Sequence, residues 1–579
     1  MTRPHILASI GFYDTATMRS TSTSTPHLLT ALAFWASLFL LIPSSSYHAS
    51  AFGTQQPAAL AISPCSRTRT AKSKYVSAVC SISGGGSGDT SDDNETSPIF
   101  RQAALVGATT AAMAFFYGQI LDTTVRSVWK KIPSLLAASG CPTLANLGGS
   151  SRYILCTMSL GGLLMGILSS ILKPSYTVAE FVAALSGKKS DVSKLPALLP
   201  ALPNLLILSL VTSTFGFSVG PEAPMVCAGG LIGLSMGKRW HNSDGDSDDA
   251  TSKKKEILVY AGAAGALTAF MGIPLAGPIF ALELTRASAN LSRSAEDSLG
   301  PAVAASAAAL FLIRGAFKGG SPMGGHFMYH ASDAIGALSG RAAMATSLFC
   351  GLGGAVLGTC FHALVHALKD IFWVPSTPNK AQTEGTTTLI NREVLVKTSI
   401  GVAVGVLSML YPQSTFWGEG SLQCVIDGHK TPFSATKHGL SSALTGSALV
   451  DPSSPFQSAS AAAQVGLAKL LSISLACAGK FPGGIIFPMF FASCPIAHSA
   501  LMVLAPHLPP SIAPTAVMCL MAALQSSVTR TPLATVFMLA LSASSTTALS
   551  TMLPSVILSS YIGVWASRFL SKDSYFDYK

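Results

Sequence analysis

Apolar stretches recur along the chain from Gln102 to Phe569, and many of them are long enough to cross a lipid bilayer. A membrane-spanning helix needs about 20 apolar residues. Only 11% of the residues are charged, whereas a soluble domain carries about 25%. A soluble fold would not keep so few charges over 579 residues. The sequence therefore predicts an all-α polytopic membrane protein.

Glycine and proline interrupt several of these apolar stretches at membrane depth, at Gly216 to Pro224, Gly272 to Pro278 and Gly479 to Pro488. Backbone that leaves the helix at that depth is tolerated where it is buried in protein or lines a cavity. Broken helices also place positively polarised N-terminal ends near the midplane, where transporters hold anions. We therefore expect broken, re-entrant helices around an anion site.

Two stretches that lie about half a protein apart resemble each other. Gly272-Ile273-Pro274-Leu275-Ala276 precedes GPIFALEL, and Arg530-Thr531-Pro532-Leu533-Ala534 precedes TVFMLAL. Transporters built from inverted repeats place matching broken helices in corresponding positions of their two halves. The similarity predicts two inverted halves with the anion site between them.

The charge balance and the cysteines exclude other partners. The net charge is +11, but no Lys/Arg run alternates with aromatic residues as a nucleic-acid patch would. The 11 cysteines are scattered and show no metal-ligand spacing, so they are interpreted as small buried hydrophobic residues. We expect no nucleic-acid partner, no metal and no cofactor.

Several motifs occur in the order and spacing found in one family of membrane proteins. Gly220-Pro221-Glu222-Ala223-Pro224 resembles the loop G-K/R-E-G-P, and Ala261 to Glu283 resembles GAAAG…PLAG…E. Lys480 to Pro488 is similar to PGGIFAP, and Phe416 to Glu419 to a loop of plant and cyanobacterial members. Tyr575 falls at the position of a central pore tyrosine. These motifs resemble the CLC family of voltage-gated chloride channels and chloride/proton antiporters.

The resemblance implies a homodimer with one pore per subunit, two inverted repeats and re-entrant helices in the lipid bilayer. Its function would be the transport of chloride or another small anion. Glu222 would be the gate, because an ionised acid competes with chloride for the same helix N-termini and protonation removes that competition. Ile485 and Ile486 would offer backbone N–H groups to the anion. Tyr575 would donate its hydroxyl.

The chain departs from the family pattern at the first anion motif. The family has GSGIP where this chain has Ser175-Tyr176-Thr177-Val178-Ala179. The serine hydroxyl expected there is replaced, and Tyr176 and Thr177 are the candidate substitutes. The choice between chloride and nitrate stays open at this stage.

A second departure concerns proton coupling. Exchangers in the family carry an inward-facing glutamate, and counting from Pro274-Leu275-Ala276-Gly277 that position is Leu284, with Glu283 beside it. One residue along a helix turns a side chain by about 100°, so Glu283 is a relay candidate rather than a direct replacement. We predict a voltage- or pH-gated chloride channel. The alternative is a chloride/proton or nitrate/proton antiporter.

A rival class is an intramembrane serine hydrolase. The pattern G-x-S-x-G of a nucleophile elbow occurs around Ser218 and around Ser235. An elbow requires a strand, a turn and a helix, together with a histidine partner, and the sequence shows neither. Small residues that pack helices produce the same pattern by chance in a Gly/Ser-rich membrane chain. An enzyme is therefore not expected.

The N-terminal region has the composition of a targeting leader. Residues 1–51 contain the short apolar run His27 to Pro43 followed by Ala49-Ser50-Ala51, which is typical of a signal peptide; a retained first transmembrane helix is the alternative. Residues 52–98 begin with Phe52, are basic and free of acids as far as Gly88, and end in a polar linker. This tandem resembles the bipartite leader of algae with complex plastids and predicts a thylakoid or envelope membrane.

The predicted transmembrane domain comprises residues 99–579. The last apolar segment ends shortly before Tyr575, and only a few residues follow. Many eukaryotic members of the resembled family carry a pair of regulatory domains after this point. We expect this pair to be missing.

Overall fold

A computed structural model describes residues 93–139, 151–172, 178–185, 195–241, 248–286, 297–316, 338–373, 386–428, 456–542 and 546–571, together with Tyr575. The predicted signal peptide and most of the predicted transit segment lie outside these residues. The first described helix, α3, begins at Asp93, inside the segment predicted to be a linker.

The described residues form helices and no β-strand. The α-helices are α3 (Asp93–Arg126), α4 (Ile132–Ala137), α6 (Ser151–Ile171), α7 (Val178–Leu185), α8 (Leu198–Thr214), α9 (Glu222–His241), α10 (Asp248–Met271), α11 (Ala276–Arg286), α13 (Leu299–Phe311), α14 (Gly340–Trp373), α15 (Thr386–Leu410), α16 (Leu422–Ile426), α18 (Ala459–Ala478), α19 (Ile486–Leu504), α20 (Ile512–Thr529), α21 (Pro532–Ser542) and α22 (Thr546–Leu570). Short π-helices follow α3 (η2, Ser127–Lys131) and α13 (η4, Leu312–Ala316), and 3-10 turns η7 (Pro412–Ser414), η8 (Glu419–Ser421) and η9 (Ala505–His507) complete the chain.

Seven of the described helical segments are long and apolar enough to cross a membrane. They are Pro98–Ala137, Arg152–Ile171, Gly340–Trp373, Arg392–Leu410, Ala459–Ala478, Ile486–His507 and Ile512–Thr529. The polytopic α-helical class predicted from the sequence is confirmed.

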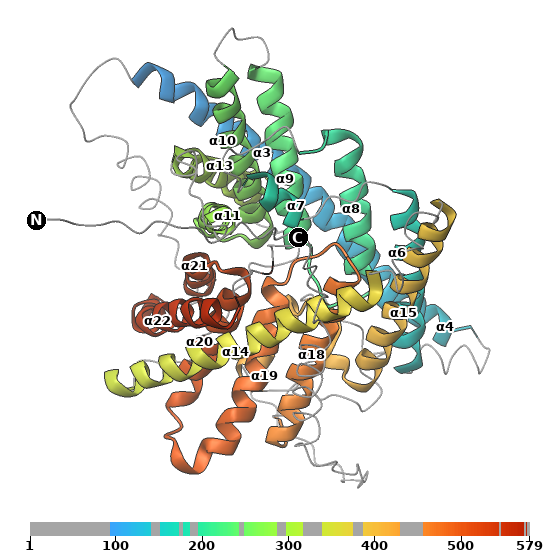
Figure 1. Cartoon of the computed structure of the whole chain (residues 1–579), viewed down its shortest axis with the longest axis vertical. Coiled ribbons are helices and arrows are strands. Elements are labelled where there is room, and N and C mark those ends of the chain that lie inside the picture. Colours follow the sequence, from blue (N-terminus) through green and yellow to red (C-terminus); the bar gives the residue numbers. More distant parts are fainter. Residues whose placement is uncertain are drawn as a thin grey trace, which may run out of the picture.

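Two sets of helices repeat the same packing. In the first half α10 packs against α3 and α13, and in the second half α20 packs against α14 and α22. The first set occupies the upper part of Figure 1 and the second set the lower part. One helix from each half, α6 and α15, pair along the right-hand side of the same view. The packing is that of two related halves.

The pairing of α6 with α15 depends on a close backbone approach. The Cα of Gly401 would lie 2.8 Å from a Cβ added at Gly162, closer than real Cβ contacts. Glycine therefore allows the two helices to touch, as small residues do between membrane helices. Further along the same interface Lys397 donates to the Ser169 hydroxyl at 2.5 Å.

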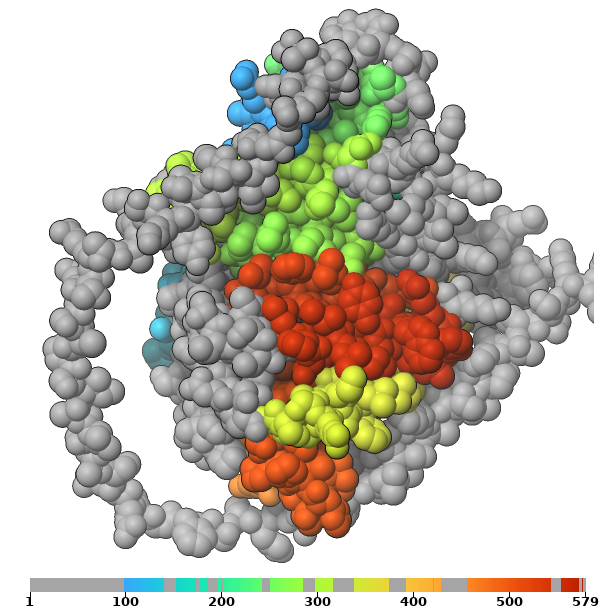
Figure 2. Space-filling view, turned by 90° about the vertical axis from the view of Figure 1, so that its left-hand side faces the viewer, coloured from blue at the N-terminus to red at the C-terminus, as the bar shows by residue number. Residues whose placement is uncertain are grey.

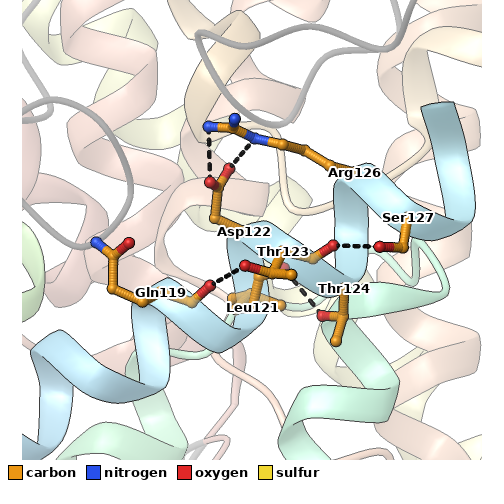
Figure 3. A network of polar contacts seen from close by, with 7 residues as sticks. All are labelled: Gln119, Leu121, Asp122, Thr123, Thr124, Arg126 and Ser127. Atoms are coloured by element: carbon orange, nitrogen blue, oxygen red, sulfur yellow. Dashed lines mark hydrogen bonds and ion pairs between the residues drawn. The ribbon is translucent and has the colours of Figure 1, made fainter. Parts of the chain in front are cut away.

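The end of α3 is held by side chains that bond back to the preceding turn (Figure 3). Arg126 pairs with Asp122 at 2.7 Å, and the Ser127 hydroxyl donates to the Thr123 carbonyl at 2.8 Å. Beyond this network, the Trp129 indole donates to the Thr214 carbonyl at 2.7 Å. Since Thr214 is the last residue of α8, this bond joins the π-helix η2 to the end of α8.

The predicted interruptions at membrane depth are confirmed as helix breaks. Helix α8 ends before Gly216 and α9 begins at Glu222. The corresponding break in the second half separates α18 from α19. Further breaks separate α10 from α11 and α20 from α21. Glycine or proline lies at each break, and both residues disfavour a continued helix. The left-handed backbone is supplied by glycine at Gly216 and Gly272 and by larger residues at Lys480 and Arg530.

Candidate functional site

The two breaks that matter most face each other across the middle of the molecule. Gly220 and Gly484 form an antiparallel bridge, with Gly220 N–H to Gly484 O at 2.8 Å and the reverse bond at 2.5 Å. Helix α9 begins two residues after the first glycine, at Glu222, and α19 begins two residues after the second, at Ile486. The N-terminal ends of both helices therefore converge on one point, which favours negative charge there.

The Glu222 side chain is fully buried at this point. A Cβ on either Gly220 or Gly484 would collide with its carboxylate, so the carboxylate lies directly against both glycines. Its own N–H and that of Phe487 approach the carboxylate. Among the described residues, neither carboxylate oxygen has a partner in hydrogen-bond geometry. A buried acid without bonded partners is costly, and inside a membrane protein such an acid marks a functional site.

A loop between α15 and α16 braces the segment that carries Glu222. The Phe416 N–H donates to the Gly216 carbonyl at 2.8 Å, and the Ser218 hydroxyl donates to the Ser414 carbonyl at 2.6 Å. The fully buried Lys469 of α18 in turn donates to the carbonyls of Ser414 and Phe416. Because these bonds satisfy the irregular backbone, the Glu222 loop can stay in place inside the protein.

Glu222 lies at the wall of a cavity of about 370 Å³. Its lining includes Ile485, Ile486 and Tyr575, so four residues predicted from the sequence share one space. Tyr575 packs against Phe361, with ring centroids 6.1 Å apart. A small anion in this cavity would have access to helix N-termini, a phenol and the acid.

The cavity also contains charged residues that the sequence reasoning did not select. Lys369 of α14 and Lys480 after α18 line it, as does Glu180 of α7. Lys369 lies over the Tyr575 ring at 5.9 Å, and Lys480 lies over the Trp373 ring at 4.4 Å. A signal existed for Lys480, because a charged residue in a loop at membrane depth is uncommon. Lys369 carried no such signal, since it lies near the end of a long helix.

Glu283 and Leu284 occupy different surroundings. The Glu283 carboxylate accepts the N–H groups of Leu533 at 3.0 Å and Ala534 at 2.7 Å, and so caps the start of α21. Leu284 is fully buried in the core. Neither residue belongs to the lining of the cavity. Glu283 therefore has a capping contact, and its role as a proton relay stays a prediction.

The remaining predicted residues divide into two groups. Tyr176 and Thr177 lie outside the described residues. Ser218 and Ser235, the elbow candidates, are surrounded by helix and loop: Ser218 donates its hydroxyl to a carbonyl, and Ser235 lies within α9. The strand–turn–helix setting that a nucleophile elbow needs does not surround either serine.

Comparison with known proteins agrees with these features. The sequence profile described as voltage gated chloride channel matches residues 161–564. No sequence among the curated proteins matches the chain.

Solved structures share the fold at low sequence identity. A slow cyanobacterial Cl⁻/H⁺ antiporter has a TM-score of 0.58 at 17% identity, covering 83% of this chain and 96% of that one. A CLC-type fluoride/proton antiporter has a TM-score of 0.50 at 17% identity, covering 83% and 97%. A eukaryotic CLC transporter has a TM-score of 0.56 at 15% identity, covering 83% and 73%. The CLC-type fold predicted from the sequence is confirmed.

Proposed function

This chain belongs to the voltage-gated chloride channel family, and we propose that it is a chloride channel whose gate is the Glu222 carboxylate. Membership of the family supports anion transport across a membrane by a multi-pass protein. Members of this family are transporters rather than enzymes.

One observation carries the proposal of a gate. The Glu222 carboxylate lies against Gly220 and Gly484, at the N-terminal ends of α9 and α19 and at the wall of the cavity. It occupies the space that helix N-termini make favourable for an anion. When ionised, it competes with chloride for that space. Protonation removes its charge and lowers its affinity for the helix ends, so the path opens.

The proposal is tested with purified protein in liposomes. We expect chloride flux that increases on acidification, and nitrate in place of chloride measures the preference between the two anions. Vesicles that stay electrically silent would favour a non-transporting scaffold. Labelling of Ser218 or Ser235 by a serine-directed probe would instead favour the hydrolase.

Passive flow is proposed in preference to proton exchange. The position expected to relay protons carries Leu284, whose side chain binds none, and Glu283 is bonded to the start of α21. The antiporter remains the second candidate, because two of the similar structures are described as proton-coupled antiporters. The reversal potential under a proton gradient at fixed chloride distinguishes the two. For a channel, the reversal potential stays at the chloride equilibrium value, whereas for an exchanger the reversal potential shifts with the proton gradient.

The proposed location of the protein is a plastid membrane. This rests on the composition of residues 1–98, in which the apolar run is followed by Phe52 and an acid-free basic stretch. A fluorescent protein carrying Met1 to Pro98 should reach the plastid, and Phe52→Ala should stop it outside. Fluorescence at the plasma membrane or vacuole would contradict this location.

We further propose that the protein is a homodimer whose two subunits contact each other through the face drawn in Figure 2. Green and red segments of the two halves lie side by side there. On α22 four large apolar side chains are exposed at helical spacing: Ile557, Tyr561, Trp565 and Phe569. Cysteine cross-linking between copies at Trp565, in lipid, tests the contact. A monomer by light scattering in detergent and no cross-link in lipid would contradict it.

A further inference from the structure

Two corresponding helix ends in the two halves carry different residues. After α8, the Gly216 N–H donates to the Ser213 carbonyl, and the Phe217 N–H donates to the Thr212 carbonyl. After α18, the Lys480 N–H donates to the Cys477 carbonyl, and the Phe481 N–H donates to the Ala476 carbonyl. The bond pattern is the same at both ends. It requires left-handed backbone, with φ of 86° at Gly216 and 57° at Lys480. Glycine is the usual residue here, because a Cβ makes this conformation unfavourable.

The lysine is not needed to satisfy the end of its helix. The last carbonyl of α18, that of Ala478, accepts the Trp373 indole N–H at 2.7 Å. The first half uses the same device, since Trp129 donates to the last carbonyl of α8. In that half, glycine follows at the left-handed position. A strained residue where glycine would do suggests a use for its side chain.

Lys480 belongs both to the protein surface and to the cavity. The residue is exposed and lines the same cavity as Glu222. Its ammonium stacks on Trp373, and Lys369, which lines the same cavity, lies over Tyr575. Each ammonium thus has an aromatic partner, and the two positive charges belong to the lining of one cavity. Positive charge at the mouth of a low-dielectric cavity raises the local concentration of anions and speeds their entry.

We propose that Lys480, together with Lys369, forms an anion-recruiting pair at the mouth of the cavity and sets the rate at which anions enter it. The inference rests on the proposed anion transport. The pair acts on small anions of any identity, because it provides charge rather than a fitted pocket.

The test compares Lys480→Gly and Lys480→Arg in the full chain, reconstituted in liposomes. Glycine removes the ammonium and supplies the residue that the backbone favours, so the melting temperature should not fall. At low chloride and low ionic strength, its flux should fall by about three- to tenfold. Raising the salt concentration should reduce this difference, because salt screens the charge. Lys480→Arg should keep the wild-type rate.

Lys130→Gln is the matched control, because it removes one positive charge from an exposed position outside the cavity lining. Its flux should equal that of the wild type. Lys369→Gln should lower the flux in the same salt-dependent way as Lys480→Gly. A Lys480→Gly protein that folds and conducts like the wild type at low chloride would overturn the inference and leave the transport proposal intact. A silent wild-type protein would overturn both.

Discussion

The half-helices α9 and α19 start at the same distance from the bridge and carry different first side chains. Each begins two residues after a glycine of the Gly220–Gly484 bridge, yet the first residue is Glu222 in α9 and Ile486 in α19. Both side chains line the same cavity. The two halves thus bring two helix N-termini to one cavity, and only the first half places an acid there, which is the acid that we propose as the gate.

A second pair of half-helices shows the same kind of asymmetry. In α11, Glu283 lies nine residues after Pro274, and in α21 Leu541 lies nine residues after Pro532. Glu283 reaches across to the start of α21, whereas Leu541 packs against the core. This contact, unlike the pairing of α6 with α15, is made by a side chain of the first half alone. In both pairs, the acid belongs to the first half.

The largest effect, on chloride flux, is expected from Glu222→Gln, which removes the ionisable side chain that distinguishes the start of α9 from that of α19. In the wild-type protein, flux should rise as pH falls, by up to about tenfold per pH unit, because one carboxyl group titrates. Glu222→Gln carries no ionisable group, so its flux should be high and nearly independent of pH. The measurement is chloride efflux from liposomes over a pH series.

Glu180→Gln is the control for this experiment. Glu180 lines the same cavity but is exposed, so this variant should keep the wild-type pH response. If Glu222→Gln responds to pH like the wild type, the buried acid is structural and the gate proposal fails.

A smaller effect, on stability, is expected from the second pair. Glu283→Leu gives α11 the residue that α21 has and leaves two N–H groups at the start of α21 without an acceptor. We expect a loss of stability of about 3–6 kcal/mol, because each of the two bonds to a charged group contributes roughly 1.5–3 kcal/mol. Thermal unfolding in detergent measures it.

Glu283→Gln distinguishes the role of Glu283 as a helix cap from its predicted role as a proton relay. It keeps an acceptor oxygen but binds no proton, so it should lose less stability than Glu283→Leu. In a channel, its reversal potential should match that of the wild type. A proton-dependent reversal potential in the wild type that Glu283→Gln abolishes would identify Glu283 as the relay of an exchanger.

The smallest effect is expected at the left-handed positions. Gly216→Ala should lower stability by about 1–2 kcal/mol because of its positive φ. An added Cβ would also lie 2.9 Å from the Trp129 ring. Lys480→Ala should leave stability nearly unchanged, because Lys480 already carries a Cβ in left-handed backbone. Equal losses of stability in Gly216→Ala and Lys480→Ala would contradict this difference between the two helix ends.

The sequence alone determined the class of protein and the positions of three of its helix breaks. Low charge and long apolar stretches are typical of a protein solvated by lipid, and clusters of glycine and proline marked the breaks, so both properties can be recognised locally. Single prolines did not mark breaks, because Pro203 and Pro495 lie inside α8 and α19. The motifs around Glu222, Ile485 and Tyr575 also identified the family. In each case the signal lies within a short stretch of chain.

Only the tertiary structure decided which residues meet. Glu283 bonds to Leu533, which lies 250 residues further along the chain. Lys369 of α14 and Lys480, which follows α18, come to one cavity, because α14 packs against α18. The likeness of Gly216 and Lys480 is visible only in their backbone angles and bonds. Such contacts depend on how the two halves fold onto each other, and no local pattern encodes that arrangement.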